Sequence, residues 1–241
     1  GLRLLGEAAR QTAEMVDRLG LDWIDVGGGL PVRYTDADPE PPTVDAWADG
    51  HAGLPGWGSR TWITEVGRHL HAGGGVTLSR IEAVKEVDGR PLIVIHVGAD
   101  LFLRRVYRPD DWDHEMIVLA PDGTPRTGTT RSSRIGGPLC FAGDLLAKDR
   151  ELPEAREGDL LLIRDTGAYT LSMWSRHCSR GLPPVWGLEG ESVVPLFRGE
   201  SADDVVRARE IERGKSGSIR EQLALWREIV RFRDLERSAL E

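Results

Sequence analysis

Lysine and cysteine are both scarce in this 241-residue sequence. Of its 31 basic residues only three are lysines, Lys85, Lys148 and Lys215, so chemistry that needs a lysine has few candidates. The two cysteines, Cys140 and Cys178, are too few for a disulfide framework, and neither lies in a spacing typical of zinc sites. We therefore expect free thiols and no metal site.

The sequence also lacks long apolar runs and an excess of basic charge. No stretch of 18 apolar residues occurs, and the first residues show none of the zones of a signal peptide, which predicts a soluble cytoplasmic protein without a membrane partner. Acidic residues outnumber basic ones 39 to 31, giving a net charge of -8. Binding to nucleic-acid phosphates needs a basic face, so this balance argues against a nucleic-acid partner.

The first part of the chain has an α/β pattern. Apolar residues at a three-and-four spacing over residues 4–19 predict an amphipathic helix that Gly20 ends. LDWIDV at 21–26 predicts a strand that runs into Gly27-Gly28-Gly29, and TWITEVG at 61–67 predicts a second buried strand. The intervening residues 34–60 are rich in Pro, Asp and Gly, so we expect a loop with one short helix near 44–48.

From about residue 75 the pattern changes to β. Two strand-like runs flank Asp88-Gly89, a dipeptide typical of hairpins, and MIVLAPDG and DLLLIRDTGAY extend the pattern. Two helices are predicted at the end of the chain, over 202–213 and from 219 to about 240.

Two polar motifs follow the predicted α/β strands. Because Gly27-Gly28-Gly29 has no Cβ atoms, its N–H groups can converge on an anion such as phosphate; the alternative is a tight strand-to-helix turn. Glu65 can hold a protonated ring nitrogen, and Arg68 can bind a phosphate or carboxylate. A surface ion pair between these two residues is the alternative.

Two further candidates lie in the β region. Cys140 and Asp144 share a glycine-rich loop, and a thiol with an ordinary pKa of about 8.5 can deliver a proton to a carbanion. The alternative for Cys140 is a small buried hydrophobic residue. Tyr169 ends a predicted strand, where its hydroxyl can bind a phosphate oxygen or simply satisfy a core position.

Together and in this order, the motifs resemble those of the pyridoxal-phosphate-dependent decarboxylases of the diaminopimelate and ornithine type, which have an alanine-racemase-like fold. The resemblance covers about residues 1–210. Its four motifs are Asp25-Val-Gly-Gly-Gly-Leu-Pro31, Glu65-Val-Gly-Arg68 in place of E-P-G-R, Cys140-Phe-Ala-Gly-Asp144, and Asp165-Thr-Gly-Ala-Tyr169 followed by Ser172-Met173.

The resemblance implies a role for each motif. The cofactor phosphate would be bound by Gly27, Gly28, Gly29, Gly67, Arg68 and Tyr169. Glu65 would pair with the pyridine nitrogen, Cys140 would protonate the substrate α-carbon, and Asp144 would position the loop or the substrate amine. In this family the cysteine loop reaches the neighbouring subunit's site, so the resemblance implies a homodimer or a dimer of heterodimers.

Two departures concern the substrate. Phe141 stands where typical diaminopimelate decarboxylases have a glutamate that recognises the distal amine. Arg108-Pro-Asp-Asp-Trp112 matches the substrate-binding R-P-x-L-Y stretch only in part, although Arg108 can still bind a carboxylate. Diaminopimelate itself is therefore disfavoured as the small amino-acid substrate that we expect as a partner.

The family's cofactor lysine lies far upstream of the glycine turn, and none of the three lysines here matches it. We therefore expect the C-terminal half of such an enzyme: the last part of a (β/α)8 barrel over 1–75, a β-barrel or sandwich domain over 76–200 and a helical tail over 201–241. An N-terminal half chain would supply the lysine, and without it the protein is expected to be inactive. The rival functions are an amino-acid racemase on the same fold, which the loop cysteine disfavours, and a non-catalytic regulatory homologue.

Overall fold

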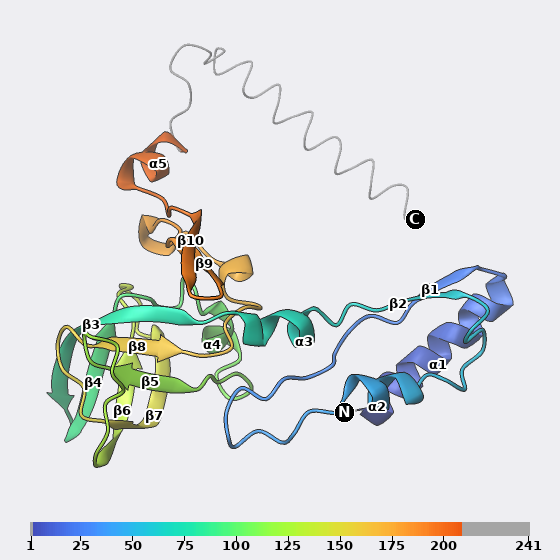
Figure 1. The fold of residues 1–241 in the computed structure, drawn as a ribbon, viewed down its shortest axis with the longest axis horizontal. Helices are drawn as coiled ribbons and strands as arrows, with labels where there is room; N and C mark the ends of the chain where they lie inside the picture. The colour runs from blue at the N-terminus through green and yellow to red at the C-terminus, as the bar shows by residue number, and fades with distance from the viewer. Residues whose placement is uncertain (1, 209–241) are drawn as a thin grey trace, which may run out of the picture. The chain divides into compact units, whose positions relative to one another are not determined.

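A computed structural model describes residues 2–208, and the chain divides into two compact units, residues 1–178 and 179–241. The helices of the first unit are α1 (Leu2–Leu19), α2 (Val44–Asp49), α3 (Gly67–His71) and α4 (Leu103–Tyr107), with 3-10 turns η1 (Ala72–Gly74), η2 (Leu171–Met173) and, at its end, η3 (His177–Ser179). Its strands are β1 (Trp23–Asp25), β2 (Thr61–Ile63), β3 (Thr77–Val87), β4 (Arg90–Ile95), β5 (Met116–Leu119), β6 (Thr130–Gly136), β7 (Leu145–Pro153) and β8 (Leu160–Ile163) (Figure 1).

The first 75 residues form a small α/β segment. β1 and β2 pair in parallel with Ile24 opposite Trp62, and α1 packs its Ala13 and Val16 on Ile24. Gly20, with φ of 65°, ends α1, and Thr43 caps α2 by accepting a hydrogen bond from the Ala46 N–H at 3.1 Å. The predicted first helix, first strand and short second helix are confirmed.

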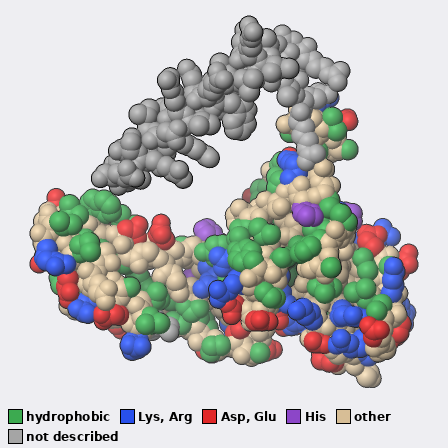
Figure 2. Space-filling view, turned by 180° about the vertical axis from the view of Figure 1, so that it is seen from behind, with side chains coloured by type: hydrophobic (Ala, Val, Ile, Leu, Met, Phe, Trp, Pro, Cys, Tyr) green, Lys and Arg blue, Asp and Glu red, His purple; other side chains and the backbone are tan. Residues whose placement is uncertain are grey.

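The prediction that the second strand is buried is wrong. Thr61 and Ile63 of β2 are both exposed, Ile63 at 42%. β2 pairs only with β1 among the described residues, so its faces have little to pack against. Apolar side chains of α1 are exposed as well, namely Leu4, Met15 and Leu19, and Figure 2 shows that apolar groups reach the surface of the molecule.

Residues 77–163 form one mixed sheet of six strands in the order β5-β8-β3-β4-β6-β7. The pair β4 and β6 is parallel, and the other neighbours are antiparallel. The two edge strands, β5 and β7, also contact each other, so the sheet is curled towards a barrel. The predicted β domain therefore has a curled, barrel-like form, built on a core of Ile81, Ile93, Ile95, Ile135, Leu146, Leu161 and Ile163.

The hairpin prediction at Asp88-Gly89 is confirmed. β3 and β4 pair with Val87 opposite Arg90, and both turn residues have positive φ, 53° for Asp88 and 74° for Gly89. Two turn residues with positive φ give the turn a twist that matches the right-handed twist of the flanking antiparallel strands. β6 and β7 were not predicted as individual strands, because TRSSRIG is largely polar and LLAKDRELP has four consecutive charged residues at its centre.

The second unit, in its described part, consists of a hairpin and a short helix. β9 (Val185–Glu189) and β10 (Ser192–Phe197) pair in antiparallel fashion, and α5 (Ala202–Arg207) follows. Ser201 and Asp204 form a capping box at the start of α5, which confirms the beginning of the helix predicted over 202–213. Its end and the helix predicted from 219 lie outside the described residues. No helix within residues 2–208 has the length and apolar character needed to cross a membrane.

Candidate functional site

The glycine turn after β1 lies against the backbone that follows β2. The Thr64 hydroxyl and the Glu65 N–H both donate to the Gly27 carbonyl oxygen, at 2.9 and 2.7 Å. A Cβ on Gly28 would lie 2.2 Å from the Glu65 carbonyl oxygen, and Gly29 has φ of 97°. No helix begins here, since the next one is α2, so the alternative of a strand-to-helix turn is wrong.

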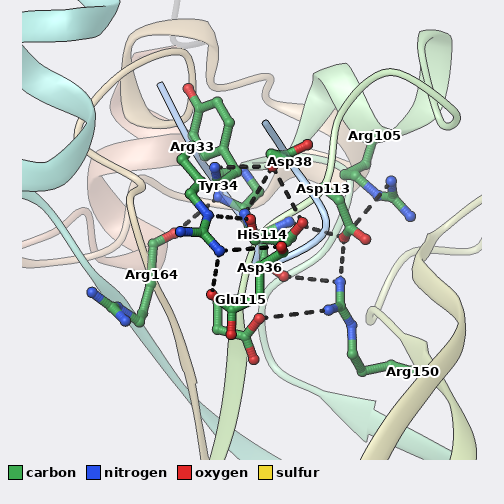
Figure 3. Close-up of polar contacts among 11 residues, drawn as sticks. Arg33, Tyr34, Asp36, Asp38, Arg105, Asp113, His114, Glu115, Arg150 and Arg164 are labelled. Atoms are coloured by element: carbon green, nitrogen blue, oxygen red, sulfur yellow. Dashed lines mark hydrogen bonds and ion pairs between the residues drawn. The ribbon is translucent and has the colours of Figure 1, made fainter. Parts of the chain in front are cut away.

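The chain that follows the glycine turn is anchored to the β domain at Tyr34. The Tyr34 carbonyl oxygen accepts a hydrogen bond from the Glu115 N–H at 3.1 Å, and Asp38 accepts from the Tyr34 and Thr35 N–H groups at 3.0 and 2.8 Å. Figure 3 shows these residues beside the start of β5. The segments around Tyr34 and Glu115, about 80 residues apart in the sequence, are thus hydrogen-bonded to each other.

Helix α4 is held in place by Arg105. Its Nε donates to the Leu146 carbonyl oxygen at 2.8 Å, and Asp113 lies 3.9 Å from Arg105 and 2.5 Å from Arg150 (Figure 3). Burial lowers the pKa of Arg105, while Asp113 opposes that effect. These contacts tie α4 to β7 and position its neighbour Arg104.

Arg104 lies between two aromatic rings. Its guanidinium carbon is 3.7 Å from the Tyr169 ring centre and 4.2 Å from that of Trp112. The Arg68 guanidinium lies 5.1 Å from the Trp112 ring, and Tyr34 packs on the same ring at 5.2 Å. We call Tyr34, Arg68, Arg104, Trp112 and Tyr169 the arginine–aromatic cluster.

The arginine–aromatic cluster is positively charged. No carboxylate of residues 2–208 forms an ion pair with Arg68 or Arg104, and the buried Arg104 Nε and Tyr34 hydroxyl have no hydrogen-bond partner in this part of the chain. Burial raises the pKa of Tyr34 to about 12, although both arginines act in the opposite direction. Two guanidinium groups beside unsatisfied polar atoms can bind an anion.

Tyr169 reaches the cluster because the segment before it is clamped to α3 and η1. The Gly167 N–H donates to the Ala72 carbonyl oxygen at 3.0 Å, and a Cβ on Gly167 would lie 1.9 Å from the His71 carbonyl oxygen. Tyr169 itself has φ of 58°, a left-handed conformation that turns its ring back towards Arg104. The motifs around Arg68 and Tyr169, about 100 residues apart, are therefore in contact.

The cysteine loop is closed by Asp144. Its buried carboxylate accepts hydrogen bonds from the Ala99 N–H at 2.6 Å and the Leu139 N–H at 2.7 Å. Cys140 is exposed, so the alternative of a small buried residue is wrong, and both cysteines are free thiols as predicted. The Cys140 Sγ lies 3.5 Å from the Cys178 Sγ, and this contact raises the pKa of the Cys140 thiol.

Comparison with known proteins identifies the family. Residues 71–167, which contain the six-stranded sheet, Trp112 and Cys140, match the family described as "Pyridoxal-dependent decarboxylase, C-terminal sheet domain". Residues 71–167 therefore belong to the pyridoxal-dependent decarboxylase family. The predicted resemblance is thereby confirmed.

Several relatives are diaminopimelate decarboxylases. The enzyme of Zymomonas mobilis is 31% identical over 208 residues, with 83% of this chain and 47% of the relative covered. That of Pseudomonas aeruginosa is 34% identical over 204 residues, with the same coverage of 83% and 47%. A crystal structure of the Helicobacter pylori enzyme complexed with L-lysine is 26% identical, with a TM-score of 0.72 and coverage of 86% and 51%. The chain spans about half the length of these decarboxylases.

Two of the three residues that the decarboxylase resemblance assigned to the substrate lie away from the arginine–aromatic cluster. Arg108 is exposed and forms an ion pair with Asp111, and Phe141 is 43% exposed with its ring 6.2 Å from that of His177. No hydrogen bond, ion pair or ring contact among the described residues joins either one to the cluster. Only Trp112 lies within it.

Sequence reasoning missed Arg104, Tyr34 and the buried His114. Arg104 stands in LRRVYR among three arginines, and no spacing distinguishes it from Arg105 or Arg108. The alternative of a surface ion pair between Glu65 and Arg68 is not found within residues 2–208, where Arg68 stacks on Trp112 instead. Among the described residues no three His, Cys, Asp or Glu side chains are grouped so as to hold a metal ion.

Proposed function

We propose that this chain takes part in the pyridoxal-phosphate-dependent α-decarboxylation of an amino acid. It would act together with barrel strands and a cofactor lysine that lie outside its 241 residues. The observation that carries the proposal is the arginine–aromatic cluster, where Arg68 and Arg104 form no ion pair within the described residues and so fit an anionic group. Membership of the decarboxylase family makes a cofactor phosphate the anion of choice.

The residues present fit the cofactor. The backbone N–H groups of Gly27, Gly28 and Gly29, with Gly67 nearby, would bind the phosphate together with Arg68 and Tyr169. Glu65, whose backbone is bonded to Gly27, would accept a hydrogen bond from the ring nitrogen and keep it protonated. When bound, pyridoxal phosphate supplies the conjugated ring that takes up the electron pair left by carbon dioxide.

Cys140 would supply the proton that replaces carbon dioxide on the substrate α-carbon. The contact with Cys178 raises the pKa of Cys140, so the proton stays on its sulfur at neutral pH. Asp144 holds the loop by its two backbone hydrogen bonds and would thereby position Cys140. We further propose that the loop acts in the site of a neighbouring subunit, which makes the working enzyme at least a dimer.

The proposed substrate is an amino acid whose far end needs no acidic partner at position 141. Phe141, whose ring is exposed, would present no charge to that end. The curated relatives are named diaminopimelate decarboxylases, and one solved structure contains L-lysine, so we place the substrate among amino acids of similar length. Arg108 is exposed and would bind a substrate carboxylate in place of the Asp111 carboxylate.

The cofactor lysine would come from outside this chain. Lys85 lies in β3 and Lys148 in β7, both exposed on the β domain, and Lys215 lies outside the described residues. The exposed apolar side chains of α1 would then pack against the remaining barrel strands.

The test is to purify the native assembly that contains this chain and measure intact masses, near-ultraviolet and visible absorbance, and carbon dioxide release from carboxyl-labelled amino acids. We expect a coloured protein that contains further barrel sequence and releases labelled gas. A native protein that consists of this chain alone, monomeric and colourless with added cofactor, would refute the proposal. Loss of optical activity without gas would identify a racemase instead.

A further inference from the structure

The only two cysteines of the sequence contact each other. Their Sγ atoms are 3.5 Å apart, although the residues are separated by 38 positions, and both side chains are exposed and unbridged. A free thiol that is accessible to solvent can react with oxidants, and one with a second thiol in contact can form a disulfide. The pair is therefore a candidate for reversible oxidation.

The backbone on each side of the pair is held in place. The residue before Cys140, Leu139, is bonded through its N–H to the buried Asp144 carboxylate at 2.7 Å. Cys178 and Ser179 both have positive φ, 54° and 59°, so the chain turns sharply where the second thiol is presented. The fold thus brings the two sulfur atoms to 3.5 Å, and a disulfide requires them to approach to about 2.05 Å.

We propose that Cys140 and Cys178 form a reversible disulfide under hydrogen peroxide, and that this bond switches off the proton donor of the decarboxylase. The first part stands on the thiol geometry alone, and the second rests on the proposed function. No family motif described above includes Cys178, so the inference does not follow from the family resemblance.

Hydrogen peroxide is the oxidant that accepts the two electrons lost by the thiols. One thiolate attacks a peroxide oxygen, the O–O bond breaks, and the sulfur becomes a sulfenic acid while hydroxide leaves and is protonated to water. The second thiolate attacks that sulfur, the S–S bond forms, the S–O bond breaks and a second water is released. In sum, two thiols and one hydrogen peroxide give one disulfide and two waters, and a dithiol reductant reverses the reaction.

The switch acts on Cys140 because a disulfide carries no proton to donate. It also ties the loop at 137–144 to η3, so the loop can no longer adjust around a substrate. The raised pKa of Cys140 makes its thiolate a minor species at neutral pH, and we expect oxidation to become faster as pH rises.

The first experiment needs no catalytic activity. The full chain, fully reduced and dilute, is treated with hydrogen peroxide, alkylated and digested without reduction. We expect a cross-linked peptide pair that contains Cys140 and Cys178, a chain lighter by two hydrogens, a single-chain band on a non-reducing gel and full recovery of both thiols with dithiothreitol. Two alkylated thiols after treatment, or cross-links between different chains only, would overturn the inference.

The second experiment tests the switch in the assembled holoenzyme. We expect peroxide to lower decarboxylation more than tenfold in the original protein and dithiothreitol to restore it even after long exposure. Relative to its own untreated rate, Cys178→Ser should become irreversibly inhibited on long exposure, because Cys140 without a partner is oxidised past the sulfenic acid. Equal recovery of both proteins would refute the switch.

The two proposals fail separately. A cross-linked peptide pair in a protein that releases no carbon dioxide would support the dithiol proposal and refute the decarboxylase proposal. Carbon dioxide release by a protein whose two cysteines form no disulfide would refute the dithiol proposal and support the decarboxylase proposal.

Discussion

Arg104 lies in α4 and Arg108 directly follows this helix, yet only Arg104 is stacked between aromatic rings. Arg108 is exposed and pairs with Asp111, the kind of contact that contributes little to stability. Cation–π contacts between partly buried groups contribute about 0.5–2 kcal/mol each. The difference between the two arginines can be measured directly.

We predict that Arg104→Ala lowers the free energy of unfolding by about 1–2 kcal/mol, since it removes contacts with both Trp112 and Tyr169. Arg108→Ala is the matched control and should change it by less than about 0.5–1 kcal/mol. Urea unfolding followed by far-ultraviolet circular dichroism measures both values. Equal decreases in the free energy of unfolding of the two variants would show that the stacking of Arg104 does not stabilise the fold.

His114 makes stability depend on pH. It is fully buried, its Nδ1 lies 2.9 Å from the Arg164 carbonyl oxygen, and burial lowers its pKa from the ordinary value of 6.5. The unfolded chain therefore binds a proton more readily than the folded one. The stabilising effect of neutral His114 is complete above pH 6.5 and is lost as pH falls below that value through the lower pKa of the folded state.

We predict that the free energy of unfolding falls between pH 7.5 and pH 5.5, and that His114→Phe removes most of this slope. The phenyl ring keeps the packing against Tyr34 and Phe102 but leaves the Arg164 carbonyl without its partner, at a cost of about 1–3 kcal/mol at all pH values. Denaturant titrations at a series of pH values test this. An unchanged slope in the variant would assign the pH dependence to other groups.

At the scale of elements, the glycine turn after β1 lies in close backbone contact with the residues that follow β2. A Cβ on Gly28 would lie 2.2 Å from the Glu65 carbonyl oxygen, whereas a Cβ on Gly67 would meet no atom within 4 Å. We predict that Gly28→Ala separates the ends of β1 and β2 and costs about 1–3 kcal/mol, while Gly67→Ala is tolerated. Thermal unfolding and limited proteolysis of residues 26–66 compare the two, and equal behaviour would contradict the contact.

Asp144 holds two loops together through the Ala99 and Leu139 N–H groups. Asp144→Asn replaces one acceptor oxygen by a donor, and we predict a loss of about 1–3 kcal/mol with faster hydrogen exchange at those two amides. The control is Asp149→Asn on β7, the strand that begins directly after Asp144, where an exposed carboxylate pairs with Arg90 and should matter by less than about 1 kcal/mol. Exchange rates that do not respond to Asp144→Asn would exclude the clamp.

The sequence predicted those elements whose local pattern and environment agree. The helix at 4–19, the hairpin at Asp88-Gly89 and the strands at 116–119 and 160–163 all have their own periodicity or turn residues. β6 and β7 do not, because curling of the sheet lets polar residues occupy much of both strands. Arg104 could not be chosen over Arg108 either, since only the turn at Tyr169 decides which arginine is stacked.

At the scale of the whole molecule, α1 carries one continuous apolar face of which only part is covered. Ala9, Ala13 and Val16 are buried, and Ala13 and Val16 pack against Ile24 of β1. Leu4, Ala8, Met15 and Leu19 follow each other at intervals of four and seven residues, which places them on a stripe beside the buried one. All four are exposed.

If the remaining barrel strands pack on this stripe, its residues contribute to assembly and not to the stability of this chain alone. We predict that Met15→Gln and Leu19→Gln each change the free energy of unfolding of the isolated chain by less than about 0.5 kcal/mol. Each should weaken association with the rest of the barrel by about 1.5–3 kcal/mol, the value of one buried large apolar side chain.

The matched control for these two variants is Arg10→Gln. Arg10 lies on α1 outside the stripe and, within residues 2–208, forms ion pairs only with the exposed Glu7 and Glu14. Ala13→Gln is the opposite control, because Ala13 is fully buried in this chain and its replacement should unfold the α/β segment before any assembly. Stability from denaturant titration and affinity from sedimentation separate the two effects. If Met15→Gln and Arg10→Gln assemble equally well, the stripe faces solvent in the complete enzyme, and the barrel strands must pack elsewhere on this chain.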